Sequence, residues 1–593
     1  MIHRTLVLAL ALTAAARPAG IEAALPAIEE RVEELRRELD LPGLAWGIVA
    51  DGETVVVRTA GDRDVASGAP VTRDTIFRIA SMTKSFTAVA ILKLRDEGKL
   101  ALDDPASRFI PELASMPLPT RDSGPITIRQ LLTHTAGFPE DNPWGDRQLA
   151  VSDERVAAWL REGIPFSTAP GTNYEYSNYG FALLGRIVAA ASGTSYTDYM
   201  NREILAPLGM DSSYWDASDV PDERRATAHR RKEGEFVAEE PLAHGAFGPM
   251  GGLWTSRDDL GRWVALMLSA FPARDDAETA PVARRTLREM HRATLTPPVS
   301  AGQRFPDGPL SAGASAYAFG LRSASDCEFD WIVGHSGGLP GFGSDMRWLP
   351  ERGVGVFAMA NVTYAPVGRI TREVLSMLDR AGAIPPRPID ASPALEDAVA
   401  RTARLVSDWD DELARELAAD NLFLDEPLAS RREAIRSLRG DLGACGAPEE
   451  IEPANALRAT FRVPCEKGWL DVRITLAPTR PPLVQHLSVR RGKPLTARAR
   501  RAAEAVVDAM RGNELSVEVA NRTAIESTLE EARETFGGCA IERVLEGDGD
   551  TDVRIRLACD RGTADLDLEL GEAGIERVDF LRPRGVRCWP ERP

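Results

Sequence analysis

The sequence of 593 residues lacks the features of several protein classes. Its seven histidines are scattered and its six cysteines include no CxxC pair, so neither residue type shows the spacing of a metal site. Basic residues are in deficit, with 71 Lys and Arg against 89 Asp and Glu. The resulting net charge of −18 argues against nucleic-acid partners, which require basic surfaces. We therefore expect no metal, no other cofactor and no nucleic-acid partner.

Long hydrophobic runs are missing beyond the N-terminus, where no stretch reaches the roughly 20 apolar residues that span a bilayer. We therefore predict no transmembrane segment. The run Leu6–Ala16 is shorter, follows His3 and Arg4, and ends in small residues, which is the pattern of a secretory signal. We predict that residues 1–24 form a signal peptide and that the protein is periplasmic or secreted in a bacterium. An uncleaved interfacial helix is the alternative.

Cysteine spacing agrees with export. Two pairs are each separated by twenty residues, and this spacing suits disulfides formed in an oxidising compartment: Cys445 with Cys465, and Cys539 with Cys559. Cys327 and Cys588 remain, and they either pair with each other or are free thiols.

The hydrophobic pattern divides the chain into regions. Residues 25–40 show helical spacing, and two strands follow, joined by the hairpin signal Asp51-Gly52. Strand-like runs return near residues 331–361, after a long helical middle. We expect the early and late strands to share one antiparallel sheet flanked by helices, an α/β (α+β) fold. Prolines between 383 and 396 indicate a linker that ends a catalytic domain spanning 25–382.

An internal repeat follows the linker. Five alternating positions recur at an offset of 94 residues: Leu457, Ala459, Phe461, Val463 and Cys465 correspond to Thr551, Val553, Ile555, Leu557 and Cys559. The period of two predicts antiparallel strands, and a helical stretch precedes each set. We predict two α+β repeats, 397–492 and 493–593, each with a small curved sheet and its own disulfide. They form either a docking, dimerising or substrate-positioning module or a passive stabilising appendage.

The first chemical motif is Ser81-Met82-Thr83-Lys84, at the start of a predicted helix. Residues three apart share a helix face, so the Lys84 amine can reach the Ser81 hydroxyl. A serine hydroxyl becomes nucleophilic when a base takes its proton, and a desolvated lysine can be that base.

Two further motifs supply polar partners. Tyr176-Ser177-Asn178 lies on a Pro- and Gly-rich loop, where a tyrosine can act as a base and an asparagine can bind an amide. His335-Ser336-Gly337-Gly338 follows a predicted strand, and its small residues permit close approach of a substrate to the backbone. The N–H groups of Ser81 and Gly338 are candidates for an oxyanion hole.

These motifs and their flanking segments, among them Leu131-Leu132-Thr133-His134-Thr135-Ala136-Gly137 and Gly248-Pro249-Met250-Gly251-Gly252-Leu253-Trp254, resemble the serine β-lactamase and penicillin-recognising enzyme family. The likeness covers about residues 25–380 and is closest to the class C β-lactamase, DD-peptidase and esterase branch. It implies a β-lactamase/DD-peptidase-like fold in which the site lies between an α/β part and an all-α lobe.

The resemblance also implies residue roles. Ser81 would be acylated, Lys84 and Tyr176 would share the proton transfers, and Tyr176 would activate water for deacylation. Five motif positions would bind the substrate: Asn178, His335, Ser336, Gly337 and Gly338. The expected activity is that of an exported serine hydrolase acting on a small-molecule or peptide substrate through an acyl-enzyme.

One departure affects the substrate. β-Lactamases of this kind usually begin the third motif with lysine, and here it begins with His335, whose side chain ordinarily titrates near pH 6.5. We expected His335 to polarise the tyrosine or, when protonated, to orient a substrate carboxylate. The replacement favours an esterase, a D-amino-acid peptidase or a DD-carboxypeptidase over efficient penicillin hydrolysis. The alternative is a penicillin- or peptide-binding protein with little or no turnover.

Overall fold

The computed structural model describes residues 18–293, 299–303, 310–440, 442–560, 562–572 and 574–581. Two compact units form, and the chain passes from the first to the second between Arg387 and Pro388. The division falls within the proline-rich stretch 383–396. Most of the predicted signal peptide lies outside the described residues. Cys588 lies outside them as well, so the structure does not describe whether it pairs with Cys327.

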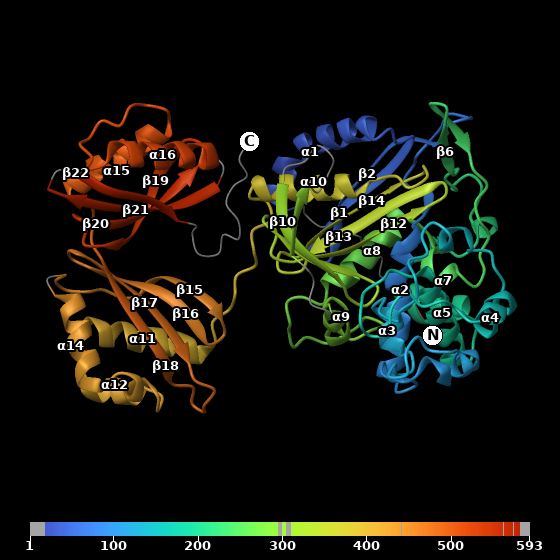
Figure 1. The fold of residues 1–593 in the computed structure, drawn as a ribbon, viewed down its shortest axis with the longest axis horizontal. Coiled ribbons are helices and arrows are strands. Elements are labelled where there is room, and N and C mark those ends of the chain that lie inside the picture. Colours follow the sequence, from blue (N-terminus) through green and yellow to red (C-terminus); the bar gives the residue numbers. More distant parts are fainter. Residues whose placement is uncertain are drawn as a thin grey trace, which may run out of the picture. The chain divides into compact units, whose positions relative to one another are not determined.

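The first unit is built around a nine-stranded sheet with the order β3-β2-β1-β14-β13-β12-β11-β10-β9 (Figure 1). The strands are β1 (Gly43–Ala50), β2 (Glu53–Asp64), β3 (Ala69–Pro70), β9 (Val299–Gln303), β10 (Leu310–Tyr317), β11 (Arg322–Asp326), β12 (Ile332–Leu339), β13 (Phe342–Leu349) and β14 (Val354–Ala360). Strand β1 pairs antiparallel with both β2 and β14. The early and late strands therefore share one sheet, as predicted.

Turn chemistry and side-chain alternation explain the centre of this sheet. Asp51 and Gly52 have φ values of +49° and +85°, the two left-handed residues that a tight hairpin between twisted strands requires. Along β1, Leu44, Trp46 and Ile48 enter one core while Ala45 enters the other. The sheet is thus buried on both faces.

Helices α1 (Ala19–Glu38) and α10 (Gly368–Arg380) cover one face (Figure 1). Helix α1 buries Leu25, Ile28, Val32 and Leu35 in the same core as α10, as its periodicity predicted. The helix begins upstream of residue 24 and also buries Ile21. A leader ending at residue 24 would therefore cut an ordered helix.

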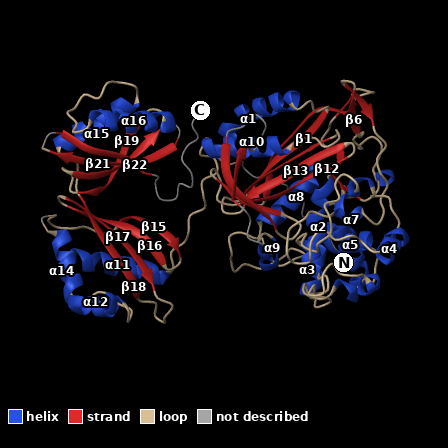
Figure 2. Ribbon diagram, viewed as in Figure 1, coloured by secondary structure: helices blue, strands red, loops and turns tan. Residues whose placement is uncertain are grey.

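The helical lobe forms much of the core on the opposite side of the sheet (Figure 2). Its helices and those beside it are α2 (Thr83–Asp96), α3 (Ile128–Leu132), α4 (Asp153–Glu162), α5 (Asn178–Ser192), α6 (Tyr196–Met200), α7 (Gly248–Gly251), α8 (Arg257–Leu268) and α9 (Arg284–Met290). Shorter helical turns are η1 (Ala80–Met82), η2 (Ala106–Arg108), η3 (Pro111–Ser115), η4 (Gly145–Arg147), η5 (Asn201–Leu205), η6 (Ala206–Leu208) and η7 (Ala217–Asp219).

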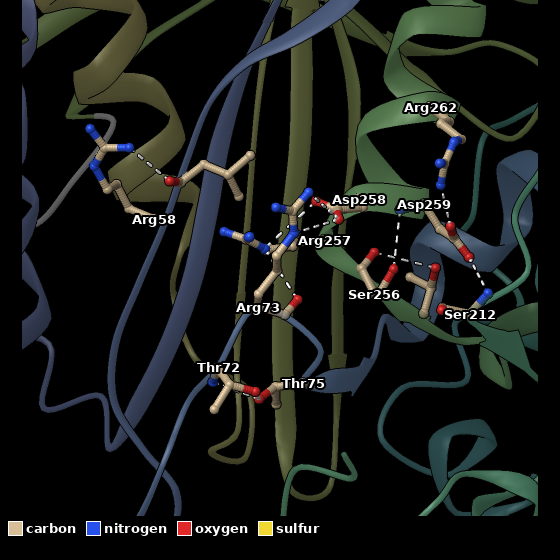
Figure 3. Close-up of polar contacts among 12 residues, drawn as sticks. Arg58, Thr72, Arg73, Thr75, Ser212, Ser256, Arg257, Asp258, Asp259 and Arg262 are labelled. Atoms are coloured by element: carbon tan, nitrogen blue, oxygen red, sulfur yellow. Dashed lines mark hydrogen bonds and ion pairs between the residues drawn. The ribbon is translucent and has the colours of Figure 1, made fainter. Parts of the chain in front are cut away.

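A small three-stranded sheet holds the segment that leads into Ser81. It has the order β4-β8-β5, with β4 (Ile76–Arg78), β8 (Trp254–Ser256) and β5 (Ser213–Tyr214). Strand β8 runs into α8, where the Ser256 hydroxyl accepts the N–H of Asp259. The Asp259 carboxylate in turn accepts the N–H of Ser212 and pairs with Arg262 (Figure 3). These contacts hold β8, and β8 pairs with β4 immediately before the nucleophile motif. A separate hairpin is formed by β6 (His229–Lys232) and β7 (Glu235–Ala238).

The second unit contains the two predicted repeats. The first comprises α11 (Pro393–Ser407), α12 (Asp411–Leu417), α13 (Leu422–Asp425), α14 (Leu428–Arg439), β15 (Glu449–Asn455), β16 (Arg458–Cys465), β17 (Gly468–Leu476) and β18 (Val484–Gly492). The second comprises α15 (Ala497–Met510), α16 (Arg522–Phe536), β19 (Cys539–Gly547), β20 (Asp552–Cys559), β21 (Gly562–Gly571) and β22 (Gly574–Leu581). Each repeat has its own hydrophobic core.

The sheet of each repeat has more strands than the sequence pattern predicted. Each has a four-stranded antiparallel meander, where alternation alone indicated two strands. The two meanders join into one eight-stranded sheet through a single parallel pairing of Gly492 with Gly547. Both predicted disulfides form, Cys445–Cys465 and Cys539–Cys559. The antiparallel sheet, helical lobe and C-terminal repeats confirm the predicted fold class.

Two absences concern the described residues only. Among them, no helix is both long and apolar enough to cross a bilayer. Within the same part of the chain, no group of three or more His, Cys, Asp or Glu side chains is arranged to hold a metal ion.

Candidate active site

Ser81 lies in the turn η1, between β4 and the first turn of α2. The preceding residue, Ala80, is fully buried and has φ +49°, a left-handed conformation that is costly for a residue with a Cβ. The backbone around it is held on two sides, because Ile79 N–H donates to Leu253 O (2.9 Å) and Ser344 Oγ donates to Ile79 O (2.7 Å). The surrounding structure thus enforces a strained turn next to Ser81, a feature that clusters at functional sites.

Lys84 is the polar centre of the site. Its Nζ is fully buried and lies 3.0 Å from Ser81 Oγ, 2.7 Å from Asn178 Oδ1 and 2.9 Å from the carbonyl oxygen of Met250. Burial lowers the pKa of Lys84 to about 7, although Asp146 and Asp141 oppose this shift by attracting the ammonium form.

A neutral Lys84 amine has two N–H donors and one lone pair. Two of its three neighbours, Asn178 Oδ1 and Met250 O, accept hydrogen bonds only. Both N–H groups are therefore directed to them, and the lone pair faces the Ser81 hydroxyl, which then donates to Nζ. This is the geometry of a nucleophile and its base.

Asn178 begins α5 and is fully buried. Its Nδ2 donates to Asn142 Oδ1 (2.6 Å), and this bond directs its Oδ1 toward Lys84. Asp141 holds the helix start, accepting the N–H of Asn178 (2.7 Å) and of Tyr179 (2.8 Å). Asn178 therefore orients the lysine, while Asn142 lines the cavity.

Tyr176 is buried beside the nucleophile and lines the same cavity. Burial raises the pKa of Tyr176 strongly, and a hydrogen bond with Ser81 offsets only part of that shift. The Nζ of Lys84 lies 4.8 Å from the centroid of the Tyr176 ring. The ring centroids of His134 and Tyr176 lie 4.3 Å apart. Tyr176 therefore stays a protonated phenol at neutral pH, suited to passing a proton on rather than to starting as a tyrosinate.

His335 is also buried, on β12. Its Nδ1–H donates to the carbonyl oxygen of Ser336 (2.6 Å), and its Nε2 accepts the hydroxyl of Tyr317 (2.9 Å). Burial, with Lys84 and Arg322 nearby, holds the pKa of His335 well below its usual value. His335 is neutral at neutral pH and bonds to Tyr317. This environment opposes the role we expected for it as a cation for a substrate carboxylate.

The third motif lies on a strand segment with one free edge. In the described ladder, β11 pairs with β12 only at Ile332, Val333 and Gly334, while β13 continues to Leu339. A Cβ on Gly337 would lie 2.3 Å from Ile79 O, so only glycine lets β12 approach the segment before Ser81 this closely. Ser336 and Gly338 line the cavity with Ser81.

Sequence reasoning missed Arg322 and Tyr317. Arg322 opens β11, is exposed, lines the cavity, and hydrogen-bonds to Tyr174. Its partner across the strands is Gly334, next to His335. Neither residue belongs to a short motif. Both reach the site because β10 and β11 lie beside β12 in the sheet. A permanent cation therefore lines the cavity from the strand beside the third motif.

These side chains surround an open cavity of about 500 Å³. Besides the residues already placed on it, its wall includes the carboxylates of Glu140 and Asp146 and the hydroxyl of Tyr364. Burial raises the pKa of Asp146, whose carboxylate accepts the Tyr364 hydroxyl (3.0 Å). The cavity wall thus presents a nucleophile, a neutral phenol, a free strand edge and a guanidinium, and the buried Lys84 amine contacts the nucleophile.

Comparison with known proteins gives consistent results. Residues 28–378 match the family model described as Beta-lactamase. The chain is 30% identical over 326 residues to the D-alanyl-D-alanine-carboxypeptidase/endopeptidase AmpH of Escherichia coli K12, covering 54% of this chain and 80% of that protein. It is 27% identical over 343 residues to protein flp of Staphylococcus aureus COL, covering 57% and 64%.

The fold also resembles that of the octameric penicillin-binding protein homologue from Pyrococcus abyssi. The TM-score is 0.51 at 21% identity, and the match covers 94% of this chain and 98% of that one. The similarity in fold therefore extends beyond the first unit. Because the family model matches more than half of the sequence, the chain belongs to the beta-lactamase family of serine hydrolases.

Proposed function

We propose that this protein is an exported serine hydrolase that forms an acyl-enzyme on Ser81 and cleaves peptides ending in D-alanyl-D-alanine. The observation that carries the proposal is the environment of Lys84, whose Nζ lies 3.0 Å from Ser81 Oγ and whose pKa is lowered to about 7. A base with a pKa near the operating pH is the most effective one for this step.

In the proposed acylation, the Lys84 amine takes the Ser81 proton while Ser81 Oγ attacks the peptide carbonyl carbon. The carbonyl oxygen becomes negatively charged and is stabilised by the N–H groups of Ser81 and Gly338. The C–N bond then breaks, and the leaving amine receives a proton from Lys84 through the Tyr176 hydroxyl. The acyl group remains bound to Ser81 as an ester.

In the proposed deacylation, a water attacks the ester carbonyl. The Tyr176 hydroxyl accepts the proton of that water while it passes its own proton toward Lys84. The ester C–O bond breaks, and Ser81 recovers its proton. Lys84 and Tyr176 act as one relay, which accords with the strongly raised pKa of the buried phenol.

Arg322 supports a substrate with a terminal carboxylate. A guanidinium stays charged at every physiological pH and binds a carboxylate with two N–H donors. In this proposal Arg322 takes the role that the neutral His335 does not, and Tyr317 holds His335 in its neutral tautomer. The likeness to a D-alanyl-D-alanine-carboxypeptidase/endopeptidase points to the same substrate class. Esters and β-lactams would be secondary substrates.

Export is supported by the predicted signal and by the two disulfides. We propose that the leader ends after Ala14-Ala15-Ala16, because a cut there leaves helix α1 whole and keeps Ile21 buried. The C-terminal repeats are then a folded module attached to the hydrolase.

The test is the mass of the intact protein after brief incubation with a D-alanyl-D-alanine peptide, a penicillin and a p-nitrophenyl ester, with product release followed in the same tubes. We expect D-alanine release from the peptide and an adduct on the Ser81 peptide with the slower substrates. A stable penicillin adduct with no turnover of any substrate would instead identify a penicillin- or peptide-binding protein. Absence of both adduct and product would reject the acyl-enzyme.

A further inference from the structure

The eight-stranded sheet of the second unit has a cavity of about 480 Å³ on its polar face. The helices of the two repeats lie on the outer sides of this sheet, with the strands between them (Figure 2). All eight strands, β15 to β22, contribute side chains to the wall. The volume is typical of a small-ligand site, and the proposed acyl transfer uses no residue of this unit.

Two ion pairs join the repeats across this cavity. Arg543 of β19 pairs with Glu450 of β15 at 3.3 Å, and Arg490 of β18 pairs with Glu546 of β19 at 2.7 Å. Three strands separate β15 from β19 in the sheet order, so this contact requires the first meander to curve toward the second. The wall of the cavity is therefore a curved sheet, which holds its side chains in defined places.

The charge on this cavity differs in sign from that of the whole chain. The chain has a net charge of −18, whereas the wall carries six arginines against five carboxylates. The carboxylates are those of Glu450, Glu452, Asp471, Glu546 and Asp565. Five of the arginines form ion pairs: Arg462, Arg490, Arg543, Arg554 and Arg556. The sixth is Arg473.

Arg473 lies on β17 between two hydroxyl side chains. Its directly opposed neighbours are Thr460 on β16 and Ser488 on β18. Within the part of the chain that the structure describes, no hydrogen bond or ion pair involves its guanidinium. Asp471 lies two residues away on the same strand, but both of its oxygens already accept N–H groups of Arg462. The donors of Arg473 are therefore available to a ligand.

The second repeat provides an internal comparison for this arginine. At the 94-residue offset, Thr460 corresponds to Arg554 and Arg473 corresponds to Asp567. Arg554 and Asp567 are directly opposed on β20 and β21 and form an ion pair at 2.6 Å. The first repeat thus has an arginine in this row of the sheet but a threonine where the second repeat has the partner charge. The missing partner is a carboxylate.

A carboxylate is also the ligand group that fits these donors. A guanidinium binds a carboxylate through two parallel N–H donors, and the hydroxyls on both sides can donate further hydrogen bonds. A phosphate dianion would bring a second negative charge close to the five carboxylates of the wall. Leu545 and Leu581 line the cavity from the second repeat, and Leu581 is 38% exposed. They offer a surface to an aliphatic part of the ligand.

We propose that this cavity binds a short peptide by its free C-terminal carboxylate. The Arg473 guanidinium and the hydroxyls of Thr460 and Ser488 hold the carboxylate, and an aliphatic side chain of the peptide contacts Leu545 and Leu581. Binding is reversible and includes no covalent step. The inference goes beyond the proposed function and does not rest on it, because no residue of the candidate active site takes part.

The first experiment measures binding of dansyl-glycyl-leucine to the full-length protein by fluorescence anisotropy. The protein carries Ser81→Ala and Arg322→Gln, which remove cleavage and the proposed carboxylate contact of the first unit. The free acid should bind at least about tenfold more tightly than the C-terminal amide, the factor for a charge-assisted hydrogen bond. Dansyl-aminoethyl phosphate should bind more weakly than the acid. Equal affinity of acid and amide, no saturable binding of the acid, or tighter binding of the phosphate would overturn the proposal.

The second experiment changes the charge beside Arg473 in the same double variant. Thr460→Asp supplies the carboxylate that the second repeat has, so Arg473 becomes paired and the affinity for the acid should fall to that for the amide. Thr460→Asn is nearly the same size without the charge and should keep the affinity. Arg473→Gln should lose as much as Thr460→Asp. Equal affinities of Thr460→Asp and Thr460→Asn would contradict the site.

A matched control is the exposed Arg500 on α15. Arg500→Gln removes the same charge from a helix of the same unit and should not change the affinity; a loss as large as that of Arg473→Gln would reduce the effect to net charge and reject the site. Thr460, Arg473 and Arg500 are all exposed, so the four variants should fold, which circular dichroism checks.

The results also separate this site from the proposed hydrolase. Carboxylate-dependent binding that requires Arg473, with no turnover of any peptide by the parent protein, would reject the hydrolase and retain the site. Peptide turnover that depends on Ser81, with no preference for acid over amide in the double variant, would retain the hydrolase and reject the site.

Discussion

In the first unit, the amine of Lys84 is fully buried and contacts Ser81, Asn178 and Met250. In the C-terminal unit, Arg462 and Arg556 form ion pairs with Asp471 and Asp565 on the directly opposed strand. The two pairs are equivalent, since 94 residues separate each arginine and each aspartate from its counterpart.

The difference lies in how each charge is balanced. Arg462 and Arg556 each have a carboxylate partner within their own meander, so their charge is balanced without a ligand. Lys84 has neutral acceptors as its direct partners, and burial lowers its pKa. A group held in this way is ready to exchange a proton, whereas a paired arginine mainly orders a surface. Ionisable side chains therefore indicate a reactive site in the first unit and structural pairing in the second.

The largest expected effect is on the nucleophile. Ser81→Ala should lower peptide and ester turnover by at least about 10³-fold, because loss of a nucleophile removes the covalent step, while the midpoints of thermal unfolding of both units stay near those of the parent. Steady-state kinetics and circular dichroism measure the two quantities. Turnover at the parent rate in Ser81→Ala would show that the site lies elsewhere.

A disulfide in the second unit should affect stability alone. The double variant Cys445→Ser and Cys465→Ser should lower the unfolding free energy of that unit by about 3 kcal/mol, the typical value for a loop of this size. Turnover by the first unit should not change. Denaturant unfolding of the full chain, with activity followed in parallel, tests both statements. A loss of turnover at low denaturant would show that the two units are energetically coupled.

The third prediction concerns pH. Lys84 must be neutral to accept the Ser81 proton, and its pKa is lowered to about 7, so kcat/KM should rise with pH and level off above about 7. Below that value the expected slope is about tenfold per pH unit for one essential base. The pKa of His335 and that of His134 are both held well below the usual value, so neither should contribute to this step. A flat profile between pH 6 and 8 would exclude Lys84 as the base.

Arg322 should affect substrate choice more than chemistry. Arg322→Gln should lower kcat/KM for a peptide with a free terminal carboxylate by about 10–30-fold, the range for loss of a charge-assisted bond. The amidated peptide and a p-nitrophenyl ester should change little. Arg322→Lys keeps the charge and should lose less than Arg322→Gln. Equal losses on the free and amidated peptides would mean that Arg322 does not bind the carboxylate.

The smallest expected effect is on the surface pairs. A double-mutant cycle on Arg462 and Asp471 should give a coupling energy below about 1 kcal/mol, as for other partly exposed ion pairs. The equivalent pair in the second repeat should be stronger, because the Asp565 side chain is only 9% exposed, against 34% for Asp471. Equal coupling energies for the two ion pairs would show that the deeper burial of Asp565 does not strengthen its pair.

Several elements could be predicted from the sequence because their signals are local. Asp51-Gly52 specifies a tight turn by its φ values, and the apolar spacing of α1 specifies one buried helix face. The cysteine pairs and the 94-residue offset identified the repeats and their disulfides. The proximity of Ser81 to Lys84 follows from their spacing of three residues alone.

Other features depend on contacts between distant segments. Arg322 and Tyr317 belong to no motif and reach His335 only because β10, β11 and β12 are neighbours in the sheet. The outer strands of each repeat lacked the matched alternation of the inner ones and were missed. The cavity around Arg473 forms where strands of both repeats meet, which no single stretch of sequence reveals.

The sequence by itself identified the candidate residues for the proposed chemistry, because a nucleophile, a base and a glycine-rich strand are recognisable as short patterns of residue types. The tertiary structure decided their protonation states. Burial lowers the pKa of Lys84 and of His335 and raises that of Tyr176. In the proposed mechanism the lysine is therefore the base, the histidine a neutral acceptor and the tyrosine a neutral phenol. Desolvation depends on every segment packed around a group, and those segments come together only in the folded chain.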